Sequence, residues 1–151
     1  MQIVVFGKEE IMWFNYDYDW WTSLSNDEKL RISIGRDILW TYVNILAFIY
    51  DINERSRPRL IGIRRLTNDN IRYCFNNENI KYVTEDMINE VFIEAVKYVN
   101  KNYSLNLDSE SIKTKYCDFN LLKNKESIRQ LLLDCTDDQK VRKEIYVAFR
   151  K

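Results

Sequence analysis

The chain has 151 residues and a mass of 18.4 kDa, a length that fits one domain with its own hydrophobic core. Hydrophobic residues make up 46% and charged residues 30%, so the composition excludes an intrinsically disordered chain. Basic and acidic residues are equal in number, 23 of each, so the molecule as a whole has no net charge that would attract nucleic acid or acidic lipid.

Several residue types that catalysis and cofactor binding require are rare or missing. The absence of histidine excludes Ser-His-Asp and Cys-His catalysis and every metal site that needs an imidazole ligand. Three glycines far apart in the sequence exclude a phosphate-binding loop and a dinucleotide fingerprint. Cys74, Cys117 and Cys135 contain no CxxC pair, which predicts reduced core residues. We therefore expect no cofactor and no metal.

The sequence also predicts where the protein acts. The opening MQIVVFGKEE lacks the basic start and long apolar stretch of a signal peptide. The longest apolar run, residues 38–50, is shorter than the roughly 20 residues that a bilayer span requires. We expect a cytoplasmic protein without membrane contact. The excess of Ile, Asn, Lys and Tyr fits an AT-rich gene, as in a low-GC bacterium or phage.

The first elements are predicted to be strands. Residues 2–6, QIVVF, favour a short strand, and the Gly-Lys pair that follows can turn the chain into a second strand that begins near Glu10. Residues 14–20, FNYDYDW, alternate aromatic and polar side chains, a period of two that a strand would place on opposite faces. A hairpin and a third strand are therefore expected.

A long helix is predicted next. Ser25 and Glu28 form a capping box at its start, and Pro58 forces the chain out of the helix at or before Arg57. Apolar residues recur at spacings of three and four, and beyond Ile38 almost every face is apolar, which is typical of a core helix. The apolar positions are Leu30, Ile34, Ile38, Leu39, Tyr42, Ile45, Leu46 and Ile49.

After this helix we expect an antiparallel meander. The runs 59–66, 71–76 and 80–83 are rich in Ile, Leu, Val and Tyr, and Asn-rich and Asp-rich segments separate them. Residues 60–66 alternate poorly, so an irregular segment is the alternative there.

The C-terminal half is predicted to be helical. Thr84 caps a helix that reaches Tyr103, and residues 104–124 form a loop with one short helix at 109–117. Apolar residues at helical spacing predict another helix over 128–135, and a capping box at 136–139 starts the last one. The predicted fold is a single α+β domain over residues 1–151, with an N-terminal hairpin, a central meander and about four helices, one of them the long core helix.

The most unusual segment is WFNYDYDWW, residues 13–21, in which six of nine side chains are aromatic. Between Glu9 and Glu28 there are six acidic residues and no basic one. Aromatic anchors beside carboxylates favour docking on a basic protein surface, whereas the alternative is aromatics that pack the core and acids that are solvated. The predicted partner-binding residues are Trp13, Asn15, Tyr16, Asp17, Tyr18, Asp19, Trp20 and Trp21.

From these features we expect a small intracellular binding protein rather than an enzyme. The predicted class is an inhibitor of the immunity or antitoxin type, which blocks the basic catalytic cleft of a toxin or nuclease through the acidic aromatic patch. This prediction depends on the indole rings being exposed to water. A second copy of the chain is an alternative partner.

Two other functions stay open. The first is nucleic-acid binding through a basic segment next to aromatic residues. The second is a His-free enzyme that uses carboxylates, such as the pairs Asp17 and Asp19, Glu9 and Glu10, or Asp137 and Asp138. The basic segment contains Arg55, Arg57, Arg59, Arg64, Arg65 and Arg72.

Overall fold

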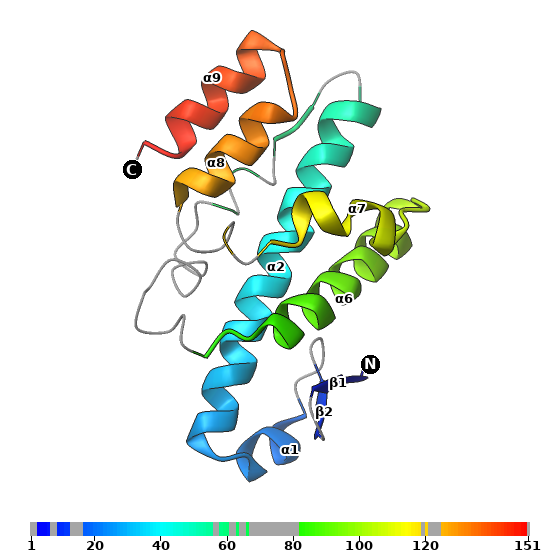
Figure 1. Cartoon of the computed structure of the whole chain (residues 1–151), viewed down its shortest axis with the longest axis vertical. Helices are drawn as coiled ribbons and strands as arrows, with labels where there is room; N and C mark the ends of the chain where they lie inside the picture. Colours follow the sequence, from blue (N-terminus) through cyan, green and yellow to red (C-terminus); the bar gives the residue numbers. More distant parts are fainter. Residues whose placement is uncertain are drawn as a thin grey trace.

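The longest element of the protein is one helix of 29 residues, α2, which extends along most of the molecule (Figure 1). The computed structural model describes residues 17–55, 58–60, 63, 66, 82–118, 120 and 125–150 with their side chains, and residues 3–6 and 9–12 by backbone alone. Six helices are found in this described part. They are α1 (Tyr18–Ser23), α2 (Asn26–Glu54), α6 (Glu85–Tyr103), α7 (Ser109–Tyr116), α8 (Lys125–Asp134) and α9 (Gln139–Ala148).

The start of α2 is fixed by its local sequence. The Ser25 hydroxyl accepts a hydrogen bond from the Glu28 amide at 3.2 Å, and the Glu28 carboxylate accepts one from the Ser25 amide at 3.0 Å. This reciprocal pair satisfies two amides that the first helical turn leaves unpaired, so the predicted capping box is confirmed. Of the predicted apolar positions, Leu30 and Ile49 are half-buried, and those buried in the core are Ile34, Ile38, Leu39, Tyr42, Ile45 and Leu46.

The end of α2 depends on one buried carboxylate, that of Asp51. It accepts hydrogen bonds from the backbone amides of Arg59 at 3.2 Å and Leu60 at 2.7 Å, and it contacts the Arg55 guanidinium at 3.4 Å. Leu60 has a φ of 57°, a left-handed conformation that costs a residue with a Cβ about 1–2 kcal/mol. The bonds to Asp51 offset this cost and turn the chain away from the helix before Pro58, as the proline predicted.

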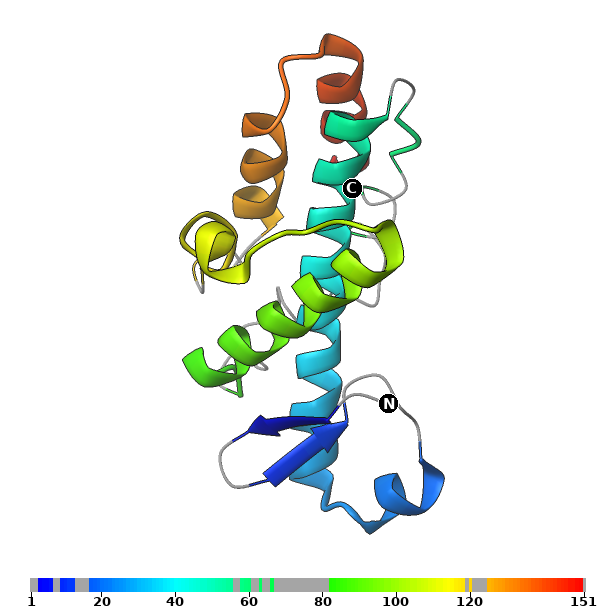
Figure 2. The same cartoon turned by 90° about the vertical axis from the view of Figure 1, so that its right-hand side faces the viewer.

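The helix α6 crosses α2 obliquely and covers its central part (Figure 2). The Thr84 hydroxyl caps α6 by accepting a hydrogen bond from the Met87 amide at 3.2 Å, which confirms the predicted start. Where the helices cross, Tyr42 and Phe92 meet edge to face with ring centroids 5.2 Å apart, and both side chains are fully buried. Burying a side chain of this size contributes about 1.5–3 kcal/mol, so this crossing forms the centre of the core.

The last two helices, α8 and α9, form an antiparallel pair beside the C-terminal half of α2 (Figure 1). The predicted cap at Thr136 is wrong by two residues, because the Asp138 carboxylate accepts hydrogen bonds from the first amides of α9. The Thr136 hydroxyl accepts one from the Asp138 amide and belongs to the turn. The Arg142 guanidinium donates to the carbonyls of Leu133 at 2.6 Å and Thr136 at 3.1 Å, which closes the connection between the two helices.

The predicted α+β class is wrong. Of the residues described with side chains, 79% are helical and none belongs to a sheet. A short antiparallel hairpin of β1 (Ile3–Phe6) and β2 (Glu9–Met12), described by backbone alone, pairs Ile3 with Met12 and Phe6 with Glu9. It lies beside α6 and the N-terminal half of α2 (Figure 2). The protein is therefore mostly helical.

The expected central meander accounts for much of this difference. Residues 58–60 form no strand, and Ile63 and Leu66 are helical and buried in the core. Two apolar residues three positions apart share one face of a helix, and burial of that face outweighs the strand preference of the run 59–66. The other predicted strands, at 71–76 and 80–83, lie outside the described residues except for Tyr82 and Val83, which are not in a strand.

Removing the Asp51 carboxylate should destabilise the fold. In Asp51→Ala the amides of Arg59 and Leu60 lose their acceptor, and we expect the free energy of unfolding to fall by about 2–3 kcal/mol. Urea denaturation followed by circular dichroism in the helix band measures the free energy of unfolding. For a protein of this size this free energy falls by about 1–3 kcal/mol for each molar of urea. Glu54→Ala, which removes an exposed acid one turn later, is the control and should change stability by less than about 0.5 kcal/mol. Equal stability of the two variants would contradict the capping role.

Candidate functional site

The acidic aromatic segment is helical where the structure describes it, so the predicted strand over 14–20 is wrong from Tyr18 onward. The Asp17 carboxylate accepts a hydrogen bond from the Trp20 amide at 3.2 Å and caps α1. A capping aspartate offers the backbone a local bond that an isolated strand cannot match, and this outweighs an alternation of only seven residues. The predicted site residues Trp13, Asn15 and Tyr16 lie outside the described residues.

The two indoles of α1 are half-buried rather than exposed on a strand face. Trp20 and Trp21 pack against the core with ring centroids 6.5 Å apart, and the Arg36 guanidinium lies 5.4 Å from the centre of the Trp21 ring. A strand would place Trp21 on the same face as Asp17 and Asp19, whereas here Trp21 packs against the core and both aspartates are exposed. These tryptophans hold α1 against the rest of the protein.

The carboxylates around α1 are exposed. We call Asp17, Tyr18, Asp19 and Asp27, whose side chains are exposed, together with the half-buried capping residue Glu28, the acidic end of the protein. Residues 17–28 contain these four acids and no basic residue, a local charge of −4. Tyr18 is 78% exposed, the largest value among the large hydrophobic side chains that the structure describes. Asp17, Asp19 and Asp27 form no ion pair with the described residues. The acidic end lies at the extremity of the molecule where α2 begins (Figure 1).

The basic segment is only partly described. Arg57, Arg64, Arg65 and Arg72 lie outside the described residues. The Arg55 guanidinium contacts Asp51 and lies 5.5 Å from the centre of the Tyr50 ring. In the described part, the basic segment therefore contributes to closing the end of α2.

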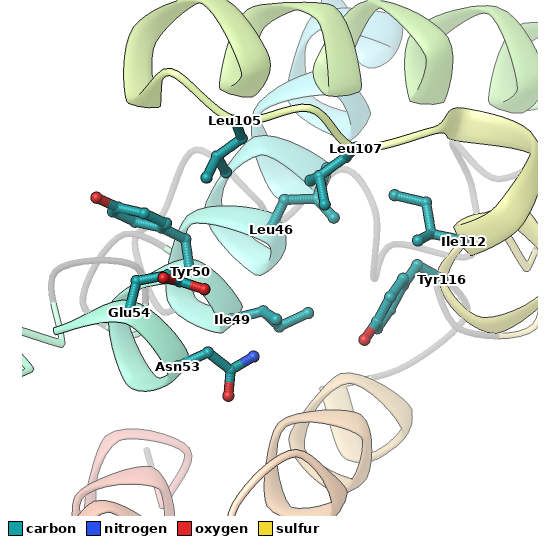
Figure 3. Close-up of a pocket in the computed structure, with 9 residues that line it drawn as sticks. All are labelled: Leu46, Ile49, Tyr50, Asn53, Glu54, Leu105, Leu107, Ile112 and Tyr116. Carbon is teal, nitrogen blue, oxygen red and sulfur yellow. The ribbon is translucent and has the colours of Figure 1, made fainter.

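A second candidate site, a pocket of about 180 Å³, was not predicted from the sequence. It lies between the C-terminal half of α2, the connection from α6 to α7, and α7 itself (Figure 3). Tyr116 faces Ile49 across it, and Asn53 and Glu54 lie at its α2 edge (Figure 3). The lining side chains are Leu46, Ile49, Tyr50, Asn53, Glu54, Leu105, Leu107, Ile112 and Tyr116.

The wall of this pocket between α6 and α7 is stabilised by two hydrogen bonds of the Asn100 side chain. The Asn100 side chain donates to the Leu107 carbonyl at 2.9 Å and accepts from the Leu107 amide at 2.9 Å. Ser104 ends α6 with a φ of 55°, and the Leu105 amide donates to the Asn100 carbonyl at 3.1 Å. Because both ends of this short connection are bonded to α6, Leu105 and Leu107 are fixed over the pocket. Residues from three separate segments make the pocket, so sequence spacing carries no signal for it.

Two carboxyl groups have strongly raised pKa values, and neither lines the pocket. Burial raises the pKa of Asp37 to about 7, and burial followed by repulsion from Asp86 raises the pKa of Glu90 to about 7. A carboxylate enzyme would combine a concave site with such shifted groups. In the described part of the chain the two features lie on different residues. Of the proposed pairs, Asp17 and Asp138 serve as helix caps.

The described cysteines are unsuited to nucleophilic or metal chemistry. Burial raises the pKa of the Cys117 and Cys135 thiols, which disfavours the thiolate. Both are free, and Cys74 lies outside the described residues. In the part of the chain that the structure describes, no group of three Cys, Asp or Glu side chains is placed to hold a metal ion.

The hydropathy of α2 meets the criterion of length and composition for a helix that crosses a membrane. Its most apolar 18-residue stretch has a mean hydropathy of 1.3, and 72% of that stretch is buried inside the protein. A core helix passes the same test, so this is weak evidence for a membrane span.

No family model, curated protein or solved structure matches this chain. The fold and its surfaces define a small, mostly helical protein with an acidic end where α2 begins and an apolar pocket beside the C-terminal half of α2. The function is therefore argued from these residues alone.

The raised carboxyl pKa values predict that stability falls with rising pH. The folded protein holds the Asp37 proton up to about pH 7, whereas the unfolded chain releases it near 3.8. Unfolding is therefore favoured progressively as pH rises from about 4 to about 7, and the effect levels off above that range. In Asp37→Asn we expect the free energy of unfolding to fall less steeply with pH and to be roughly 1–2 kcal/mol higher at the alkaline end of the range. This value is smaller than the full pKa shift would give, because solvent screens a half-buried group.

Chemical denaturation at a series of pH values measures this effect. Asp137→Asn removes an exposed carboxyl from the turn before α9 and is expected to keep the pH profile of the unsubstituted protein. A profile that Asp37→Asn leaves unchanged would show that burial of Asp37 does not set the pH dependence.

Proposed function

We propose that this protein binds a basic protein surface through its acidic end and acts as an inhibitor of the immunity or antitoxin type. Because the indoles of α1 are half-buried, the proposal is carried by another observation: Tyr18 is 78% exposed between the exposed carboxylates of Asp17 and Asp19, and residues 17–28 contain no basic residue. A large side chain left in water among charges of a single sign contributes nothing to the core. It is the composition expected of a steered docking surface.

The packing behind this surface supports the proposal. Trp20 and Trp21 are half-buried against the core, and Asp17 caps the first turn, so α1 presents Tyr18 and Asp19 from a supported backbone. An aromatic anchor that is ordered before binding loses little conformational entropy in the complex. The two tryptophans act as the foundation of the surface, and the contact residues are Asp17, Tyr18 and Asp19, with Asp27 and Glu28 at its border.

The charge of the acidic end indicates the class of target. Clefts that act on nucleic acid carry Lys and Arg for the phosphate groups, and carboxylates on a rigid surface can occupy the same positions. Such a surface repels nucleic acid itself. We therefore propose a nuclease-like toxin as the target, met in the cytoplasm of the bacterial or phage-infected cell that makes both proteins. The arginine segment offers less support in the described part, where Arg55 is engaged by Asp51 and Arg59 is the one exposed arginine.

Charge reversal at the acidic end should slow association with the partner. Asp19→Lys with Asp27→Lys leaves both helix caps intact, and we expect the association rate constant to fall about tenfold at low salt and less at high salt. The partner is first isolated with the tagged protein from the source cells and identified, and surface plasmon resonance then measures the kinetics with the purified partner. Inhibition of the partner's nuclease activity is measured in parallel.

A matched control variant has the same net charge as the charge-reversal variant. Asp137→Lys with Glu144→Lys makes the same change at exposed positions beside and on α9, and it should leave the association rate within about twofold of the original. Tyr18→Ala should accelerate dissociation instead, because it removes the aromatic anchor. Equal slowing by both double variants, or a partner without a basic surface, would refute the proposal.

A further inference from the structure

The pocket beside α7 has the shape and lining of a small-molecule site. Its volume of about 180 Å³ slightly exceeds the roughly 150 Å³ of an apolar protein cavity that takes up one benzene ring. Leucine and isoleucine side chains form most of its lining, and Leu46 at its base is buried. A single ring with a short substituent therefore fits the available space.

Among the nine residues that line the pocket, one carries a charge, Glu54. Asn53 and Glu54 are exposed, which places the opening at the last turn of α2. Glu54 is the only one of the nine lining residues that is charged at neutral pH, and it makes no ion pair or hydrogen bond with the described residues. A negative charge at the C-terminal end of a helix opposes the helix dipole. Among the described residues this carboxylate has no partner, in contrast to that of Asp51, which accepts hydrogen bonds from the Arg59 and Leu60 amides.

The pocket is also supported before any ligand binds. The paired hydrogen bonds of Asn100 with the Leu107 backbone hold one wall, and Tyr116, on the opposite side, is buried. The Tyr50 ring, at the opening, is fixed between the Tyr103 ring and the Arg55 guanidinium. An apolar cavity whose walls are held in this way binds without a large ordering cost.

We propose that this pocket binds a small organic amine whose single apolar ring fills the cavity and whose ammonium group pairs with Glu54. The site lies on residues of α2, α7 and the α6–α7 connection, and none of its lining residues belongs to the acidic end. It is therefore a second binding site that goes beyond the proposed inhibitor function. Its test does not depend on the protein partner.

Three probes that share a phenyl ring on a short side chain, and differ in the charge at the end of that side chain, test the proposal. They are 2-phenylethylamine, ethylbenzene and phenylacetate, each titrated into the isotope-labelled protein while amide chemical shifts are followed by NMR. We expect shifts centred on residues 105–112 and the last turn of α2. The amine should bind about fivefold more tightly than ethylbenzene, which corresponds to one exposed ion pair, and phenylacetate should bind most weakly.

Two pairs of variants separate the head group from the body. Glu54→Gln should reduce the affinity for the amine to that for ethylbenzene, whereas Glu110→Gln, an exposed acid of α7 outside the pocket, should leave it unchanged. Ile112→Trp should fill the cavity and abolish the shifts with all three probes, whereas Val147→Trp, at an exposed position on α9, should not. Glu54→Gln changes only an exposed side chain, so it tests the ion pair even if Ile112→Trp fails to fold.

Several results would overturn the proposal. Shifts located away from the pocket, or no shifts with any probe, would show that the cavity is not a binding site. Equal affinity for the three probes would remove the role of Glu54. Tightest binding of phenylacetate would assign the head group to a cation instead, either Arg55 beside the Tyr50 ring or Lys115 beside the Tyr116 ring.

Discussion

The contact between α2 and α6 is the interaction on which the rest of the structure depends. A 29-residue helix with apolar residues on almost every face of its C-terminal half is unstable in water unless other elements surround it. The crossing at Tyr42 and Phe92 buries one face, and α7 and the pair α8 and α9 lie along the C-terminal half (Figure 1). The other described helices are thus arranged by the need to cover α2.

This arrangement places the two candidate sites at different parts of the same helix. The acidic end lies where α2 begins, because α1 is short and joins α2 through the Ser25 cap. The pocket lies where α2 ends, because α7 and the α6–α7 connection approach the helix without filling the space beside Ile49. The inhibitor and amine proposals therefore rest on separate residues, and a substitution at one site leaves the contacts of the other intact.

The sequence predicted helices well and strands poorly, for a physical reason. The Ser25 capping box, the Thr84 cap and the apolar spacing of both long helices are local features, and the structure confirms each of them. The alternation in FNYDYDW and the β-type run before Leu66 are equally local, but a strand needs partners supplied by the fold. Burial of Ile63 and Leu66 and the Asp17 cap favour helix instead. For the candidate site, the sequence located the charge of the acidic end, but the strand alternation placed Trp21 on the exposed face of the aspartates, whereas its ring packs against the core.

By itself, the sequence determined that these residues offer no imidazole and where the two long helices begin, because residue type and near-neighbour spacing are sufficient for both. It also determined that acids without bases gather around Tyr18, since charge is a property of composition. Only the tertiary structure decided that Trp20 and Trp21 turn toward the core while Tyr18 stays in water. It alone brought Glu54 beside Leu107 and Ile112, because exposure and cavities arise from segments that are distant in the chain and meet only when α2 is covered.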